Sequence, residues 1–168
     1  MRSFVLKDCL WSLHFVAFRM IQYVPSLYNF SIMIIRKQFR FEAAHRLPNH
    51  TGKCGHLHGH SYRVEIAIEW DISMDATSPS QGMVMDFAEL HPIKDRIDMH
   101  RDHAFIGYKD DHLTQYCIDQ WWRVSVLEYP PTAEMMAQHL GELFRQDFPL
   151  HSITLWETET SSVVWMRG

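Results

Sequence analysis

Cysteine is scarce in this sequence, which has only three such residues among 168. Cys9, Cys54 and Cys117 are an odd number of cysteines at no spacing typical of a disulfide framework. Extracellular domains that rely on disulfides carry denser and paired cysteines, whereas this usage suits a reducing compartment. We therefore expect a cytoplasmic protein.

Long apolar runs and a strong net charge are also missing. Residues 1–32 contain many aromatic and aliphatic side chains, but no run there approaches the roughly 18 apolar residues that a membrane span needs. They also lack the apolar core and small-residue cleavage site of a signal peptide. The formal net charge of -4 gives no electrostatic footprint for nucleic acid or an anionic membrane surface. We expect neither kind of partner.

The length fits one domain with a sizeable core. A hydrophobic content of 46% with 21% charged residues is typical of a globular protein, and no repeat or low-complexity tract divides the chain. Because a strand pattern begins directly after residue 32, we assign residues 33–168 to the domain. We interpret residues 1–32 as a short accessory helix, as a disordered extension, or as the product of a start codon placed too early, with Met33 as the natural start.

Hydrophobic periodicity predicts the elements of the domain. Alternation predicts strands at 33–43 and 60–72, separated by a loop at 47–59 that contains glycine and proline. A capping box of Asp86 and Glu89 predicts a helix start, with Pro92 as a possible kink, and Thr132 is the expected cap of a second helix. We expect 101–113 to be irregular. Further strands are predicted at 121–128, 153–157 and 163–167. This order predicts an α+β fold with an antiparallel sheet and helices on one face.

Histidines gather between the first two predicted strands, where five of the twelve occur: His45, His50, His56, His58 and His60. Two residues apart on a strand, His58 and His60 point to the same face, and His45 ends the adjoining strand. Gly59 between them suits close backbone approach. Three neutral imidazoles around one ion, with a position left open, are typical of catalytic zinc. This pattern does not decide whether Cys54, in the same loop, is a ligand or a reactive thiol.

Other candidates are weaker when taken alone. Asp102 and His103 form a pair of the kind that is common on surfaces, but an acid–base reaction needs a second proton carrier and histidine titrates in the right range. Glu157 ends a predicted strand among apolar residues. A carboxylate there is either a solvated edge residue or an acceptor for paired N–H groups of a ligand.

Six pieces of the sequence, in order, carry a resemblance: FEAAHRL, KCGHLHGHSYRVEI, GMVMDFAEL, DHAF, PTAE and ETETSS. Together they resemble the family of 6-pyruvoyl-tetrahydropterin and 6-carboxy-tetrahydropterin synthases, over about residues 33–168. The resemblance implies the tunnelling fold, in which ββααββ subunits assemble into barrels. The implied assembly is commonly a homohexamer made of two trimers, with active sites between neighbouring subunits.

The resemblance also implies a role for each matching position. His45, His58 and His60 match the Zn²⁺ ligands, and Cys54 matches the catalytic cysteine, so the resemblance favours a base over a ligand. The family's catalytic Asp-His pair matches Asp102 and His103. Asp98 and His100 lie close by in the sequence, but DHAF gives the best match to the family. Three positions match the pterin pocket: Glu157, which anchors the ring, and Thr132 and Glu134 in PTAE.

The implied substrate is 7,8-dihydroneopterin triphosphate. Three residues separate Cys54 from His58, a spacing that resembles the bacterial branch of queuosine synthesis, in which 6-carboxytetrahydropterin forms with release of acetaldehyde and triphosphate. Two alternatives stay open: a 6-pyruvoyl-tetrahydropterin synthase, and a non-catalytic pterin- or metal-binding homologue. The chain departs from compact members after the pair, where Ile106 and Gly107 replace a Leu-Asn and a segment runs from Tyr108 to Trp122. Substrate or product scope can differ as a result.

Overall fold

The computed structural model describes residues 32–168. Residues 1–31, which make up nearly all of the predicted extension, lie outside the described part. The strands are β1 (Met33–His45), β2 (His58–Trp70), β3 (Ala104–Tyr108), β4 (Val124–Leu127), β5 (Leu150–Trp156) and β6 (Ser162–Met166). The α-helices are α1 (His91–His100), α2 (His112–Asp119) and α3 (Ala133–Phe144), and short 3-10 helices occur at η1 (Lys53–Gly55) and η2 (Phe87–Leu90).

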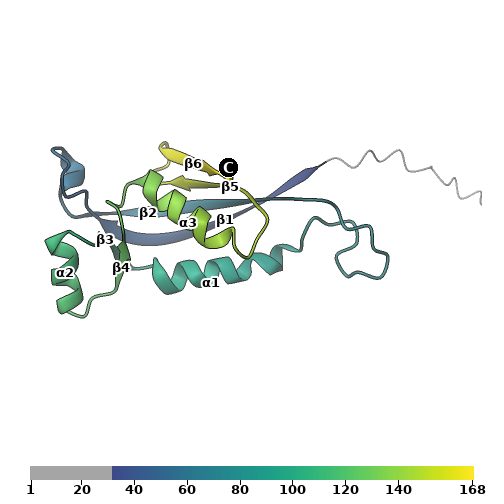
Figure 1. Cartoon of the computed structure of the whole chain (residues 1–168), viewed down its shortest axis with the longest axis horizontal. Coiled ribbons are helices and arrows are strands. Elements are labelled where there is room, and N and C mark those ends of the chain that lie inside the picture. Colours follow the sequence, from purple (N-terminus) through teal and green to yellow (C-terminus); the bar gives the residue numbers. More distant parts are fainter. Residues whose placement is uncertain (1–31) are drawn as a thin grey trace, which may run out of the picture.

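The six strands form one sheet in the order β4-β3-β1-β2-β5-β6 (Figure 1). The four strands β1, β2, β5 and β6 are antiparallel neighbours, which confirms the predicted α+β core. However, β3 runs parallel to both β1 and β4, so the sheet is mixed and the expectation of a purely antiparallel sheet is corrected.

The prediction that 101–113 is irregular was wrong, because this stretch contains β3 and the start of α2. Four of the five residues of β3 are buried, so the strand shows no alternation of apolar and polar side chains. A short apolar run of this kind cannot be assigned by periodicity alone. Asp111 caps α2 through a hydrogen bond that its side chain accepts from the Leu113 amide.

β1 and β2 form a long hairpin in which alternate residues face the core. In their register Phe41 lies opposite Tyr62, and these two buried rings stack with centroids 5.0 Å apart. The same face continues to the strand ends, where His45 lies opposite His58. The apolar face of the hairpin therefore leads directly into the histidine cluster.

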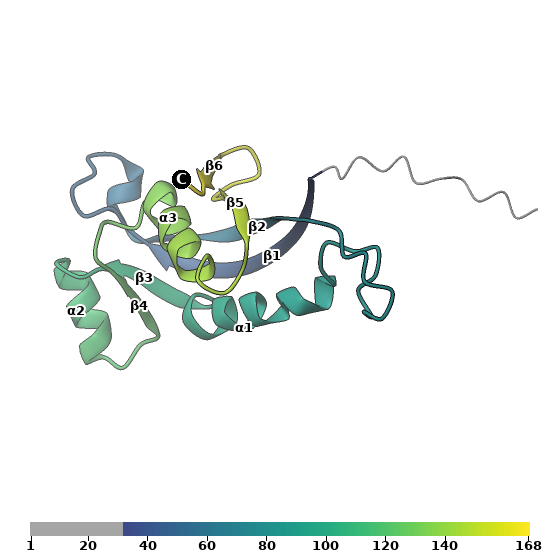
Figure 2. The same cartoon turned by 45° about the vertical axis from the view of Figure 1, so that its right-hand side comes forward.

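Helices α1 and α3 lie on the same side of the sheet (Figures 1 and 2). Their buried residues join those of β1, β2 and β5 in one core cluster. Helix α2 packs against the opposite face of β3. Ile106 of β3 belongs to the core, whereas its neighbour Gly107, on the opposite face, abuts Thr114 of α2. The expectation of helices on one face thus holds for α1 and α3 but not for α2.

The predicted helix starts are confirmed with one refinement. Asp86 and Glu89 form the capping box, but they cap η2 rather than α1. Pro92 lies in the first turn of α1, where proline is tolerated, so no kink arises from it. Thr132 caps α3 by accepting a hydrogen bond from the Met135 amide, at 3.3 Å.

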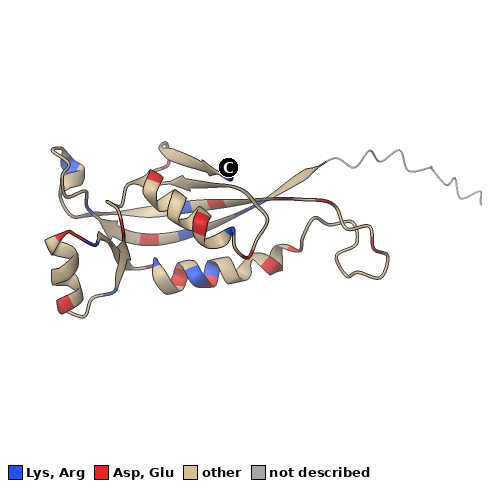
Figure 3. Ribbon diagram, in the orientation of Figure 1, with Lys and Arg blue, Asp and Glu red and all other residues tan. Residues whose placement is uncertain are grey.

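Charged residues of both signs are interspersed along α1 and the sheet (Figure 3). Within residues 32–168, no helix is both long and apolar enough to span a membrane.

Candidate active site

Three imidazoles meet where β1 and β2 end. His45, His58 and His60 each offer a nitrogen, and these ligand atoms lie within 4.8 Å of one another. The ring centroids of His45 lie 4.5 Å from His58 and 5.2 Å from His60. The cross-strand register produces this meeting, since it places His58 opposite His45 and His60 opposite Ala43. The predicted grouping of the three histidines is confirmed.

Main-chain carbonyls orient two of the rings. Nδ1 of His45 is 2.8 Å from the carbonyl oxygen of Pro131, and Nδ1 of His58 is 2.8 Å from that of His56. Because a carbonyl only accepts, Nδ1 carries the proton in the neutral form of each ring, and Nε2 then has a free lone pair. This arrangement is typical of metal-binding histidines, whose second nitrogen is held by an outer partner.

Two of the Nε2 atoms are buried without a hydrogen-bond partner, those of His45 and His60. Buried polar nitrogens are normally satisfied, so such a pair calls for a ligand. Desolvation by burial lowers the pKa of both His45 and His60. Lowered pKa values keep the rings neutral near pH 7, the state in which imidazole binds a metal. The residues present therefore fit a divalent cation.

Two further side chains adjoin the cluster. The Glu157 carboxylate lies 3.3 Å from Nε2 of His45 and 3.6 Å from Nε2 of His60. The fully buried Tyr62 packs edge-on against His60, and its hydroxyl also has no hydrogen-bond partner. Burial is the main cause that raises the pKa of this hydroxyl, and Glu157 and Cys54 add to it. Glu157 was a predicted site residue. Tyr62 was not, although its place two residues after His60 indicates the same face.

Cys54 lies in η1, within the loop that joins β1 to β2. The loop is closed by the Leu47 amide, which donates to the Cys54 carbonyl at 2.8 Å. The thiol is free and half-buried. The loop that carries it connects the two strands that bear His45 and His58.

Asp102 and His103 contact β1 at Glu42, through hydrogen bonds to its main chain. The Glu42 amide donates to Asp102 Oδ1 at 2.9 Å, and the His103 amide donates to the Glu42 carbonyl at 2.6 Å. His103 has a positive φ of 53° and a side chain that is 77% exposed, with Nε2 3.8 Å from Asp102 Oδ2. Within residues 32–168, no hydrogen bond or ion pair joins this pair to the histidine cluster. Within the described part of the chain, the predicted residues therefore form two groups that are not joined by hydrogen bonds or ion pairs.

Thr132 and Glu134 lie at the start of α3, next to Pro131, whose carbonyl orients His45. The Thr132 hydroxyl is engaged as the helix cap, and the Glu134 side chain is exposed in the first turn. The N-terminus of α3 thus borders the cluster through its main chain.

The amino-acid pattern of 6-pyruvoyl tetrahydropterin synthase matches residues 34–167. The chain belongs to this family. It is 37% identical over 134 residues to a 6-carboxy-5,6,7,8-tetrahydropterin synthase from Synechocystis sp., which covers 77% of this chain and 89% of the relative. It is 31% identical over 134 residues to the enzyme of that name from Haemophilus influenzae, with 76% of this chain and 94% of the relative covered.

Solved structures share the architecture of this family member. An uncharacterized protein from Wolinella succinogenes superposes with a TM-score of 0.70 at 25% identity, over 82% of this chain and 99% of the other. The 6-pyruvoyl tetrahydropterin synthase of Caenorhabditis elegans gives a TM-score of 0.63 at 20% identity, over 84% of this chain and 100% of the other. The tunnelling fold that the sequence motifs implied is confirmed.

Proposed function

We propose that this protein is a zinc-dependent 6-carboxy-5,6,7,8-tetrahydropterin synthase that acts on 7,8-dihydroneopterin triphosphate, in the synthesis of queuosine and other 7-deazapurines. The observation that carries the proposal is the group of three imidazoles whose Nε2 atoms converge. Relatives with the carboxy activity in their names, 31–37% identical over most of the chain, support the choice of product.

His45, His58 and His60 would hold the metal through their nitrogens. A bound Zn²⁺ supplies Lewis-acid chemistry, which polarises substrate oxygens and acidifies neighbouring C–H and O–H bonds. An all-nitrogen set of three neutral imidazoles suits zinc and leaves a position open for the substrate. The carbonyls of Pro131 and His56 would keep the rings aimed at that position.

Cys54 is the proposed base that takes a proton from a side-chain carbon of the substrate. Its position in η1, between the strand that ends at His45 and the strand that begins at His58, supports this role. Loss of that proton permits elimination of the triphosphate. In the carboxy reaction one water molecule is then consumed as the side chain is cut: its oxygen enters the products, the carboxylate stays on the ring and acetaldehyde leaves. Glu157 would hold the pterin ring through paired hydrogen bonds from its N–H groups, a geometry that carboxylates favour. Thr132 and Glu134 would line the same pocket.

His103, oriented by Asp102, is the proposed proton relay, supplied by a neighbouring subunit. The lack of any hydrogen bond or ion pair between this pair and the histidine cluster, within residues 32–168, supports that arrangement. So do the sheet edges: among the described residues, β6 has no strand beyond it, and β1 pairs with β3 only at residues 43–45. Unpaired edges invite a further strand, and repeated head-to-tail pairing closes a ring. We infer a barrel-forming homohexamer made of two trimers.

The product decides between this proposal and its nearest alternative. Purified, metal-loaded protein is incubated with 7,8-dihydroneopterin triphosphate, and the products are identified by mass spectrometry. We expect 6-carboxytetrahydropterin, acetaldehyde and triphosphate. Formation of 6-pyruvoyltetrahydropterin would assign the alternative synthase, and intact substrate would indicate a binding protein without turnover.

A further inference from the structure

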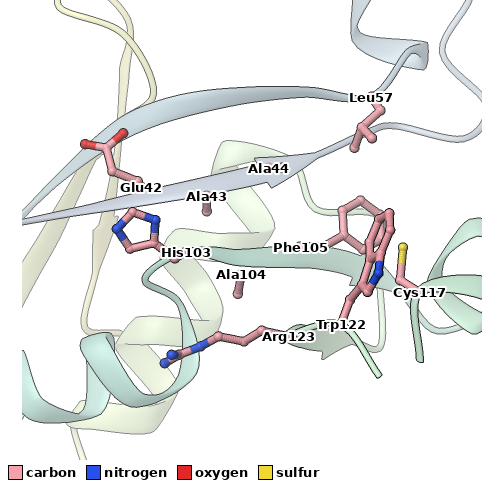
Figure 4. Close-up of a pocket in the computed structure, with 10 residues that line it drawn as sticks. All are labelled: Glu42, Ala43, Ala44, Leu57, His103, Ala104, Phe105, Cys117, Trp122 and Arg123. Atoms are coloured by element: carbon pink, nitrogen blue, oxygen red, sulfur yellow. The ribbon is translucent and has the colours of Figure 1, made fainter. Parts of the chain in front are cut away.

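A cavity of about 560 Å³ lies beside His103, and none of the three clustered histidines lines it. Its volume falls within the range of small-molecule sites. His103 and Glu42 lie toward one end, and the side chains of Phe105, Trp122 and Leu57 lie toward the other (Figure 4). The cavity thus combines one proposed proton carrier with an aromatic wall.

The segment that departs from compact relatives builds this wall. Trp122 follows α2, and its amide donates to the Cys117 carbonyl at 3.0 Å. The Tyr116 ring packs edge-on against Trp122 with centroids 6.2 Å apart. The Phe105 amide donates to the Arg123 carbonyl at 2.9 Å, which ties β3 to the residue after Trp122. Main-chain hydrogen bonds therefore fix the backbone at Phe105 and Trp122, whose rings form the wall.

The polar side chains near the cavity are largely engaged elsewhere. The Arg123 guanidinium donates to the carbonyls of Asp98 and Met99, at the end of α1. The Glu42 carboxylate accepts a hydrogen bond from the Ser61 hydroxyl at 2.6 Å. His103 is left as the polar group available to a ligand. An apolar, aromatic lining with one polar group suits a flat heterocycle far better than a polyphosphate.

We propose that Trp122 is a specificity-determining residue, which packs against the face of the planar heteroaromatic ring of the ligand on which His103 acts. This inference rests on the proposed function. Glu157 would bind the edge of a pterin ring and leave its faces to be covered. The aromatic wall of the cavity that His103 of the neighbouring subunit also lines would cover one of them. Trp122 remains 55% exposed in one chain, so its ring is accessible to such a ligand.

Equilibrium binding tests the inference without requiring turnover. The probes are neopterin, which has the ring but no phosphate, and inorganic tripolyphosphate, which has no ring. We expect Trp122→Ala to weaken neopterin binding by about tenfold, the upper range for one aromatic contact, and to leave tripolyphosphate binding unchanged. Trp122→Phe should restore most of the affinity. In turnover, KM for the pterin substrate should rise more than kcat falls.

Trp121→Ala is the matched control, because this neighbouring tryptophan is 95% exposed and does not line the cavity. It should change neither binding constant. The inference is overturned if wild-type protein does not bind neopterin, if both probes weaken equally, or if Trp122→Ala alters the assembled mass, which would assign Trp122 to a subunit interface. Wild-type protein that binds neopterin but turns over no substrate would instead refute the proposed function alone.

Discussion

At the scale of single residues, the most informative feature is a set of atoms without partners. Three buried polar atoms near the cluster lack hydrogen bonds: Nε2 of His45, Nε2 of His60 and the Tyr62 hydroxyl. A buried polar group without a partner typically costs about 1–3 kcal/mol. Three such atoms close together are difficult to explain as ordinary packing, but they are expected where a metal and a polar ligand bind.

Metal content tests the proposed ligand set. His58→Ala removes one of three nitrogens, so we expect the purified protein to lose stoichiometric metal, measured by elemental analysis. His56→Ala is the control, since only the main-chain carbonyl of His56 orients His58 and the substitution keeps that carbonyl. Full metal retention in His58→Ala would remove His58 from the ligand set.

A second residue-scale prediction concerns the ion pair of Arg46 and Asp111, which joins the end of β1 to the cap of α2. Because Asp111 is buried and Arg46 partly so, we expect Asp111→Asn to destabilise the protein by about 2–3 kcal/mol in urea unfolding near pH 7. Exposed Asp110→Asn is the control and should change stability by less than about 0.5 kcal/mol.

The same pair predicts a pH dependence. Hydrogen bonds from Arg46 are the main cause that lowers the pKa of Asp111 below its ordinary 3.8. The pair's stabilisation is therefore fully present above pH 3.8 and is lost as pH falls through the folded-state pKa below it. The difference in unfolding free energy between wild-type protein and Asp111→Asn should shrink over that acidic window. A constant difference down to the lowest accessible pH would contradict the assigned pair.

At the scale of elements, the parts that sequence predicts well are those with strong periodicity. The hairpin of β1 and β2 follows from alternation, and its register then brings His45 to His58. The pieces missed were β3 and α2, because a five-residue strand buried on both faces shows no alternation. The parallel pairing of β3 was equally hidden, since it depends on contacts with β1 some sixty residues earlier. The main-chain carbonyl of Pro131, which orients the His45 ring, could not be predicted. Every residue type has a main-chain carbonyl, so the sequence does not indicate which one contacts a histidine.

Packing of α3 against β6 depends on a glycine. A Cβ at Gly141 would lie 2.4 Å from the Trp165 ring, a rigid neighbour that cannot yield easily. Alanine favours helix by up to about 1 kcal/mol, but overpacking of this kind costs about 1–3 kcal/mol. We expect the clash to prevail, so that Gly141→Ala lowers the unfolding free energy by about 1–2 kcal/mol.

The background substitution Trp165→Leu distinguishes the clash from a backbone effect. With the ring removed, Gly141→Ala should become neutral or stabilising, because only helix propensity remains. Gln138→Ala, on the exposed face of α3, is the control and should change the unfolding free energy little. Destabilisation by Gly141→Ala that persists in the Trp165→Leu background would show that the ring is not the cause.

At the scale of the whole molecule, no hydrogen bond or ion pair joins the two halves of the candidate site within residues 32–168. The histidines occupy the core-facing side of the hairpin, whereas Asp102 and His103 dock through main-chain bonds at Glu42. Two strand edges have no neighbour among residues 32–168: that of β6, which carries exposed Val164 and Met166, and that of β1 before residue 43, which carries exposed Ile34. Apolar, unpaired edges on opposite sides of one sheet favour association between copies. Assembly would then be a condition of activity as well as of stability.

Mixed assemblies test whether each site draws on two subunits. Cys54→Ala and His103→Ala should each be inactive alone. If Cys54 and His103 of one site come from different chains, co-expressed and randomly mixed variants regenerate intact sites. Roughly a quarter of the sites should then recover turnover, since each of two independent positions is intact in half of the chains. If both residues served the same site from one chain, no mixture would contain an intact site. An inactive mixture whose mass and metal content match those of wild-type protein would therefore place the complete site within a single chain.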